Sequence, residues 1–132
     1  MDKELNNVQN DNTLPCQEQL NAVHTTLNLL NGKWKIYIIG SLRFGKKRFM
    51  ELQREVENVG SKMLSKDLRE LEINGLVIRT VHNTKPVIIE YELTPYGRTL
   101  ESIIREMVKW GLEHQKRCFD LQNSNGTIDN PK

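Results

Sequence analysis

A chain of 132 residues with 37% hydrophobic and 27% charged residues has the size and composition of one soluble globular domain, which argues against a disordered or membrane protein. No apolar run approaches the roughly 20 residues that a membrane helix needs, and no apolar signal-peptide core follows Met1, so we expect a cytoplasmic protein without a membrane partner. The net charge is only +2, but residues 43–66 hold seven cations and three carboxylates, which is compatible with a nucleic-acid partner or with an ordinary solvated surface.

Both ends of the chain have polar sequences without a helical or strand period. Residues 1–14 are rich in Asn and Gln, and residues 120–132 are similarly polar. Such segments bury too little apolar surface to fold, so we expect flexible tails on either side of a single domain at residues 15–119.

Four helices are predicted in the first half of this domain, each from apolar residues at three- and four-residue steps. They span about Gln17–Leu30, Lys33–Phe44, Phe49–Val56 and Ser61–Ile73. Asn31-Gly32 is a pair that commonly stops a helix, and Gly45 is the expected C-cap of the second helix. Ser61 is the expected N-cap of the fourth.

The hydrophobic period then changes from that of a helix to that of a strand. Leu76–His82 and Val87–Leu93 are rich in β-branched and aromatic residues, and the four residues between them predict a hairpin loop. Thr94 is expected to cap a last helix over Pro95–Phe119. Helices, a hairpin and a long helix make a mainly α (α+β) winged helix–turn–helix, whose second helix enters the DNA major groove while the hairpin lies beside it on the backbone.

The fourth predicted helix, Ser61–Ile73, has the pattern of a recognition helix. Its core side carries leucines, Leu64, Leu68 and Leu71. The other side carries polar donors, Ser61, Lys62, Ser65, Lys66 and Arg69. At ~100° per residue the three cations lie within roughly 40° of the side opposite the leucines. Such side chains can donate to phosphates or base edges, although a helix that merely faces solvent has the same pattern, and nearby Glu70 and Glu72 favour that alternative for the second half.

Further phosphate contacts are expected from basic residues in the hairpin and before the third helix. In the hairpin they are Arg79 and Lys85, although Arg79 could instead serve as an ion-pair partner, and the role of His82 stays open. Before the third helix, Lys46 and Arg48 are the expected contacts, with a solvated run of charge as the alternative.

Several motifs carry a resemblance to a known family: Asn31–Lys35, Arg48–Leu52, Ser61–Glu72, Gly75–Val81 and Glu90–Gly97. Over about Cys16–Trp110 the chain resembles the HxlR-type family of bacterial transcriptional regulators. The resemblance implies a winged helix–turn–helix homodimer, joined through its first and C-terminal helices, that binds double-stranded DNA as a repressor or activator. A two-fold dimer would place two reading helices about one DNA turn apart on a palindromic operator.

The same resemblance implies a redox role for Cys16. Members of the family often have a cysteine just before the first helix, and in several of them it senses electrophiles, quinones or oxidants. Helix N-termini favour the reactive thiolate form of cysteine, although a structural cysteine at the dimer seam is the alternative. Cys118 matches no motif of the family, and its pairing with Cys16 across a dimer is a further possibility.

Other classes of function have little support in the sequence. The two cysteines are far apart and lack the spacing of zinc ligands, and no nucleophile motif, carboxylate pair or Gly-rich phosphate loop is present. We therefore expect no metal, no cofactor and no enzymatic activity. The remaining alternative is a winged-helix module that binds protein without specific DNA binding.

Overall fold

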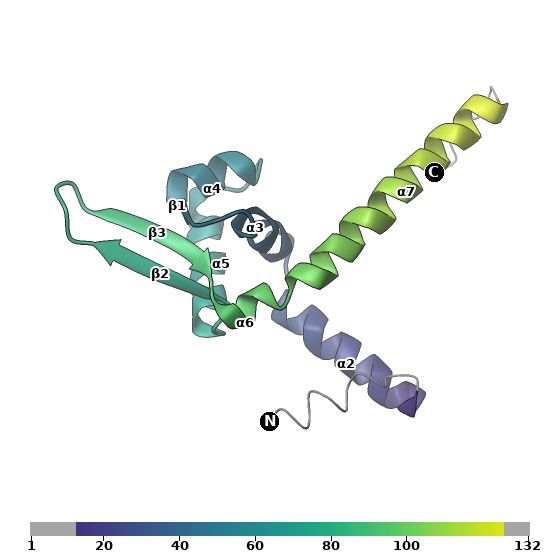
Figure 1. The fold of residues 1–132 in the computed structure, drawn as a ribbon, viewed down its shortest axis with the longest axis horizontal. Coiled ribbons are helices and arrows are strands. Elements are labelled where there is room, and N and C mark those ends of the chain that lie inside the picture. Colours follow the sequence, from purple (N-terminus) through teal and green to yellow (C-terminus); the bar gives the residue numbers. More distant parts are fainter. Residues whose placement is uncertain (1–12, 126–132) are drawn as a thin grey trace.

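The computed structural model describes residues 13–125, and its helices and strands follow the order expected from the sequence except for an added short strand and a break in the last helix (Figure 1). The elements are α2 (Cys16–Leu29), α3 (Lys35–Leu42), β1 (Lys47–Arg48), α4 (Phe49–Glu55), α5 (Ser61–Ile73), β2 (Val77–His82), β3 (Ile88–Leu93), α6 (Pro95–Arg98) and α7 (Glu101–Asn125). From α2 to β3, the ends of every expected element lie within two residues of the observed ones. The winged helix–turn–helix is confirmed, with α4 and α5 as the helix pair and β2–β3 as the wing.

A third strand, β1, was not expected. The sheet has the antiparallel order β1-β3-β2, and Lys47 and Arg48 of β1 lie opposite Tyr91 and Glu90 of β3. We had interpreted residues 46–48 as a connecting segment, because a strand of two residues is too short to show an alternating pattern. The pairing attaches the basic segment before α4 to the base of the wing.

The core lies between α3, α4, α5 and the inner face of the sheet, and the start of α7 closes it. Its fully buried side chains are Ile38, Ile39, Leu42, Leu52, Leu64, Leu68, Leu71, Leu76 and Val77. Burying an aliphatic side chain of this size contributes about 1.5–3 kcal/mol. The three leucines expected on the inner side of α5 therefore anchor that helix and leave its other side free.

The last helix is broken where we expected it to be continuous. Thr94 caps α6 as expected, its Oγ1 accepting from Gly97 N at 2.8 Å, and Pro95 occupies the first helical position. After α6, Thr99 and Leu100 N–H groups donate to carbonyls three residues back, at 3.1 Å each. These tighter bonds turn the chain so that Leu100 enters the core, and α7 then leaves in a new direction.

Two further expectations need correction. The N-cap of α5 is Gly60, with Ser61 as the first helical residue, since the extended backbone at Gly60 precedes the first turn. The helix expected to end near Phe119 continues as α7 through Asn125, so residues 120–125 of the expected C-terminal tail are helical. Polar residues such as those after Phe119 lack an apolar period, but most are tolerated in an exposed helix. The expectation of a tail at 1–12 and 126–132 falls outside the described residues.

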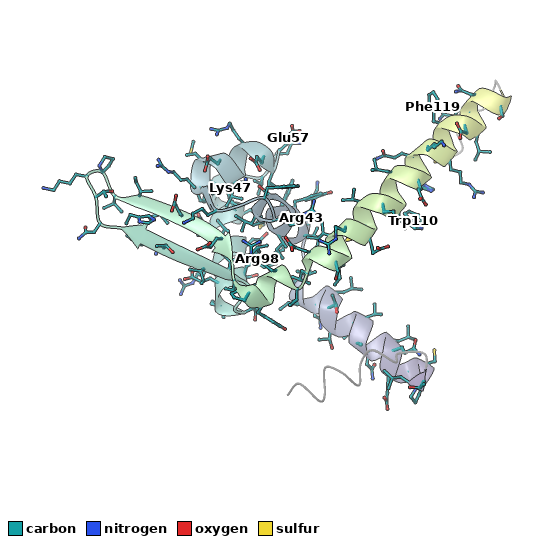
Figure 2. All side chains as sticks on the ribbon, in the orientation of Figure 1. Arg43, Lys47, Glu57, Arg98, Trp110 and Phe119 are labelled. Atoms are coloured by element: carbon teal, nitrogen blue, oxygen red, sulfur yellow. The ribbon has the colours of Figure 1, made fainter. Side chains whose placement is uncertain are left out.

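Two helices extend away from the core with their apolar side chains exposed. Figure 1 shows α2 and α7 leaving the rest of the fold in different directions. None of the residues of α2 is buried, and Leu27 is 64% exposed. On α7, Trp110 is 67% and Phe119 61% exposed, and both lie on the part of the helix beyond the core (Figure 2). Within residues 13–125, no helix combines the length and apolarity needed to cross a membrane.

Candidate nucleic-acid interface

The outward side of α5 carries the polar residues that we expected there. Ser61, Lys62, Ser65, Lys66 and Arg69 are all exposed, while the leucines of the same helix are buried. Gly60 leads into α5 in an extended conformation, and no side chain among residues 13–125 caps the N-terminus of this helix. Its first N–H groups are therefore available to an anion such as a phosphate. The structure thus presents a cationic helix face, and its contact with DNA stays a prediction.

An ion pair that the sequence analysis missed restrains one of these cations. Lys66 Nζ lies 3.0 Å from Glu70 Oε2, one helical turn away. The hydrogen bond that Lys66 donates to Glu70, reinforced by the charge of Glu70, raises the pKa of Lys66 above its usual value. Because Lys66 is exposed and Glu70 is only half-buried, solvent screens this pair and it contributes little to stability. A phosphate that binds Lys66 must compete with the carboxylate of Glu70.

Glu70 also joins α5 to α3 through a buried lysine. Lys35 Nζ donates to Glu70 Oε1 at 2.5 Å and to Asn31 Oδ1 at 2.9 Å. The hydrogen bonds from Lys35 and then Lys66 lower the pKa of Glu70 below its usual value. We had assigned Glu70 to a solvated acidic half of the helix, so its role as a bridge between two lysines is a correction. The four-residue spacings of Asn31 with Lys35 and of Lys66 with Glu70 were visible in the sequence, but nothing in it connected Lys35 to Glu70.

Asp67 is the other buried charged residue among those described. It lies on the inner part of α5 and is 4% exposed, as is Lys35. Burial raises the pKa of Asp67, while the charges of Lys35 and then Lys66 oppose that rise. The underside of α5 is therefore polar at Asp67 and Glu70 and apolar at the leucines. A helical pattern places Asp67 beside Leu68 and Leu71 but does not indicate which cation approaches it.

The residues of the basic segment before α4 divide between surface and structure. Lys46 and Arg48 are exposed, as their expected role requires. Lys47, labelled in Figure 2, keeps only 14% of its side chain exposed, and its Nζ lies 3.6 Å from Glu55 Oε2. Glu55 also accepts from the Ser41 hydroxyl at 2.5 Å. Lys47 therefore links β1 to the end of α4, while its neighbours face outward.

The sheet separates two of the residues that we expected to contact phosphates. Lys47, Tyr91 and Arg79 occupy one row of directly opposed residues, and Arg48, Glu90 and Thr80 occupy the next. Since successive rows face opposite sides of a sheet, Arg79 and Arg48 lie on opposite faces. Both are exposed, as is Lys85 in the loop of the wing.

His82, whose role the sequence left open, is engaged within the wing. Its Nε2 lies 2.8 Å from Glu90 Oε1 on the neighbouring strand. This contact gives His82 a structural partner and places a carboxylate on the same face as Arg48. The structure therefore offers no free imidazole for a phosphate at this position.

Cys16 and Cys118 are both exposed thiols. Cys16 is the first residue of α2, and Cys118 lies near the end of α7, its Sγ 3.6 Å from His114 Nε2. The outer ends of these two helices lie far apart in Figure 1. Residues 13–125 hold no cluster of three or more His, Cys, Asp or Glu side chains that could bind a metal ion.

Comparisons with known proteins identify relatives of this chain. A family model described as HxlR-like helix-turn-helix matches residues 29–119. YtcD of Bacillus subtilis (strain 168), named as an uncharacterized HTH-type transcriptional regulator, is 45% identical over 98 residues, which cover 74% of this chain and 78% of the relative. The reduced form of the redox regulator HypR matches with a TM-score of 0.70 and 39% identity, over 75% of this chain and 98% of that one. The reduced form of the transcriptional regulator YodB from B. subtilis matches with a TM-score of 0.62 and 34% identity, over 74% and 91% of the two chains.

Proposed function

Because this chain belongs to the HxlR-like helix-turn-helix family of transcriptional regulators, we propose that it acts as a homodimer that reads a palindromic DNA operator with α5. The observation that carries this proposal is that α5 has one buried apolar side and one exposed cationic side. Leu64 and Leu71 are completely buried, while the serines and cations of the helix face solvent beside an open helix N-terminus. A helix held in this way can enter the major groove without losing its contacts with the core.

Different residues have different tasks in this proposal. Ser61, Lys62 and Ser65, near the N-terminus of α5, reach base edges and the nearest phosphates. Lys66 and Arg69 follow on the same face. Basic residues outside α5 add phosphate contacts, which supply affinity and position but no sequence information: Lys46, Arg48, Arg79 and Lys85.

The homodimer is supported by apolar surface that one chain leaves uncovered. Leu20, Val23 and Leu27 form an exposed stripe on α2. A groove of about 690 Å³ lies between α3 and the start of α7, and its apolar lining includes Tyr37 and Met107. Exposed apolar surface of this extent marks an interaction site. A second copy that covers it with its own α2 and α7 forms a self-complementary two-fold contact.

The DNA reading is tested with Lys62→Ala/Lys66→Ala in a binding assay on the protein's own upstream DNA. We expect affinity to fall at least about tenfold and the slope of log K against log salt to decrease by up to about two units, because two phosphate or base contacts are lost. Lys109→Ala/Lys116→Ala removes the same charge from exposed positions on α7 and serves as the matched control. If the first variant keeps wild-type affinity and salt dependence, the proposal that α5 binds DNA fails, and the alternative of a protein-binding module gains support.

Within this function we further propose that Cys16 senses electrophiles or oxidants. The thiol is exposed at the first position of α2, the helix that joins the proposed dimer interface. HypR, whose reduced form shares this fold, is described as a redox regulator. Modification of a thiol at the interface would change the geometry of the two reading helices. Operator binding measured with and without diamide tests this step.

A further inference from the structure

A charged side chain of α3 lies against the inner side of α5, where an apolar side chain would be expected. Lys35, the first residue of α3, is 4% exposed and lies among core residues that include Ile38 and Ile39. Burying an ammonium group is costly unless its donors are matched by acceptors. Here Nζ donates to Asn31 Oδ1 and to Glu70 Oε1, so the charge is paired and hydrogen-bonded.

The contacts of Lys35 continue to the outer face of α5. Glu70 receives Lys35 on Oε1 and Lys66 on Oε2, at 2.5 and 3.0 Å. A line of hydrogen bonds therefore runs from Asn31, in the turn after α2, through the buried lysine to a cation on the proposed reading face. In the described residues this is the one such line that joins α5 to the turn between α2 and α3.

The ion pair has one buried member, because the side chain of Lys35 is 5% exposed and that of Glu70 is 37% exposed, and burying charges makes such pairs poor sources of stability. Replacing such a pair with apolar side chains of similar volume is often neutral or stabilising, because the charges lose their hydration. Leu64, Leu68 and Leu71 pack one side of α5 against the core. The hydrogen bond from Lys35 to Glu70 adds a restraint on the rotation of the helix about its axis, because its strength depends on direction.

We propose that Lys35 is a positioning residue for DNA reading, which sets the rotation of α5 through Glu70 and thereby the placement of Lys66. The inference rests on the proposed function and adds a residue that does not contact DNA. It assigns Lys35 a role in discriminating the operator from other DNA. A small rotation of α5 misplaces base-edge contacts but leaves phosphate attraction nearly intact, so selectivity suffers more than overall affinity.

The test uses the full chain with Lys35→Met/Glu70→Met, which removes both charges and keeps similar volumes. Thermal unfolding and the affinities for upstream DNA and for unrelated DNA are measured at one salt concentration. Because the variant also takes the charge of Lys35 away from the buried Asp67, we expect a lower unfolding temperature, and below that temperature the ratio of the two affinities falls at least about fivefold. Glu72→Met, which removes an exposed carboxylate of the same helix, is the matched control and should keep the wild-type ratio.

The outcomes separate the two proposals. If the wild type itself does not prefer the upstream DNA, the proposed function fails and the role of Lys35 fails with it. If the wild type is selective and the folded double variant keeps the same ratio, the role of Lys35 is overturned and the proposed function stands. If the double variant unfolds, Glu70→Gln decides, because its amide offers only one oxygen to the two lysines; an unchanged ratio there also overturns the inference.

Discussion

Single side chains on α5 determine which charges are available to DNA. Lys62 and Arg69 have no ion-pair partner among the described residues, whereas Lys66 shares Glu70 with the buried Lys35. The free cations can bind a phosphate without breaking an existing contact. Lys66 has to exchange one carboxylate for a phosphate, so its contribution to affinity is the smaller difference between the two interactions.

The prediction at this scale concerns Cys16. Diamide takes two electrons and two protons from a pair of thiols, which become a disulfide, so wild-type operator binding should change on treatment and recover with dithiothreitol. The Cys16→Ser variant should bind the operator with wild-type affinity, and diamide should not change that affinity.

The Cys118→Ser variant is the matched control. If diamide changes operator binding by Cys118→Ser as it does for the wild type, the disulfide joins Cys16 of two copies. If diamide has no effect on Cys118→Ser, the disulfide joins Cys16 to Cys118. If both thiols of the wild type are modified and operator binding does not change, Cys16 is not a sensor, while the proposal that α5 binds DNA is unaffected.

At the scale of elements, the junction of the wing with α6 fixes how the domain meets its C-terminal helix. Thr94 Oγ1 donates to Gly75 O at 2.6 Å while accepting from Gly97 N, so one hydroxyl ties the end of α5 to the start of α6. Gly97 packs directly on the backbone of Leu76, where β2 is about to begin. This close approach positions the turn that sends Leu100 into the core.

Gly97→Ala tests the importance of this junction. A Cβ at position 97 would come within 2.1 Å of the Leu76 carbonyl oxygen, a backbone atom that cannot simply rotate away. We expect the free energy of unfolding to fall by at least about 2 kcal/mol, measured by denaturant titration. Gly111→Ala on α7 is the control, because a Cβ there meets no atom within 4 Å. Equal stability of the two variants would contradict the close packing of α6 on Leu76.

At the scale of the whole molecule, two helices of the chain leave apolar surface exposed. The core is closed around α3, α4, α5 and the sheet, but α2 contributes no buried residue and most of α7 is exposed. Helices that extend without covering their apolar faces are stabilised by association rather than by their own propensity. The proposed homodimer would cover these apolar faces, and it would also set the separation of the two copies of α5.

Leu27→Glu is the corresponding prediction. A carboxylate in the apolar stripe of α2 would be buried without a partner in the dimer, so we expect a monomer in analytical ultracentrifugation. Operator affinity should fall at least about tenfold, because the two half-sites are no longer bound together. Thr25→Glu, on the other side of α2, should remain dimeric. A dimeric Leu27→Glu variant would exclude this stripe from the interface.

The sequence by itself determined the order of the main helices and strands, the presence of the wing, and which side of α5 is buried. These follow from local periods, from Thr94-Pro95 and from the leucines of α5, which act over a few neighbouring residues. Tertiary structure decided the rest. It paired β1 with β3, turned the chain between α6 and α7, and gave Glu70 two lysines, one of them 35 residues away. The physical reason is that periodicity records which side of an element is buried, whereas the partner across the core depends on how the elements pack.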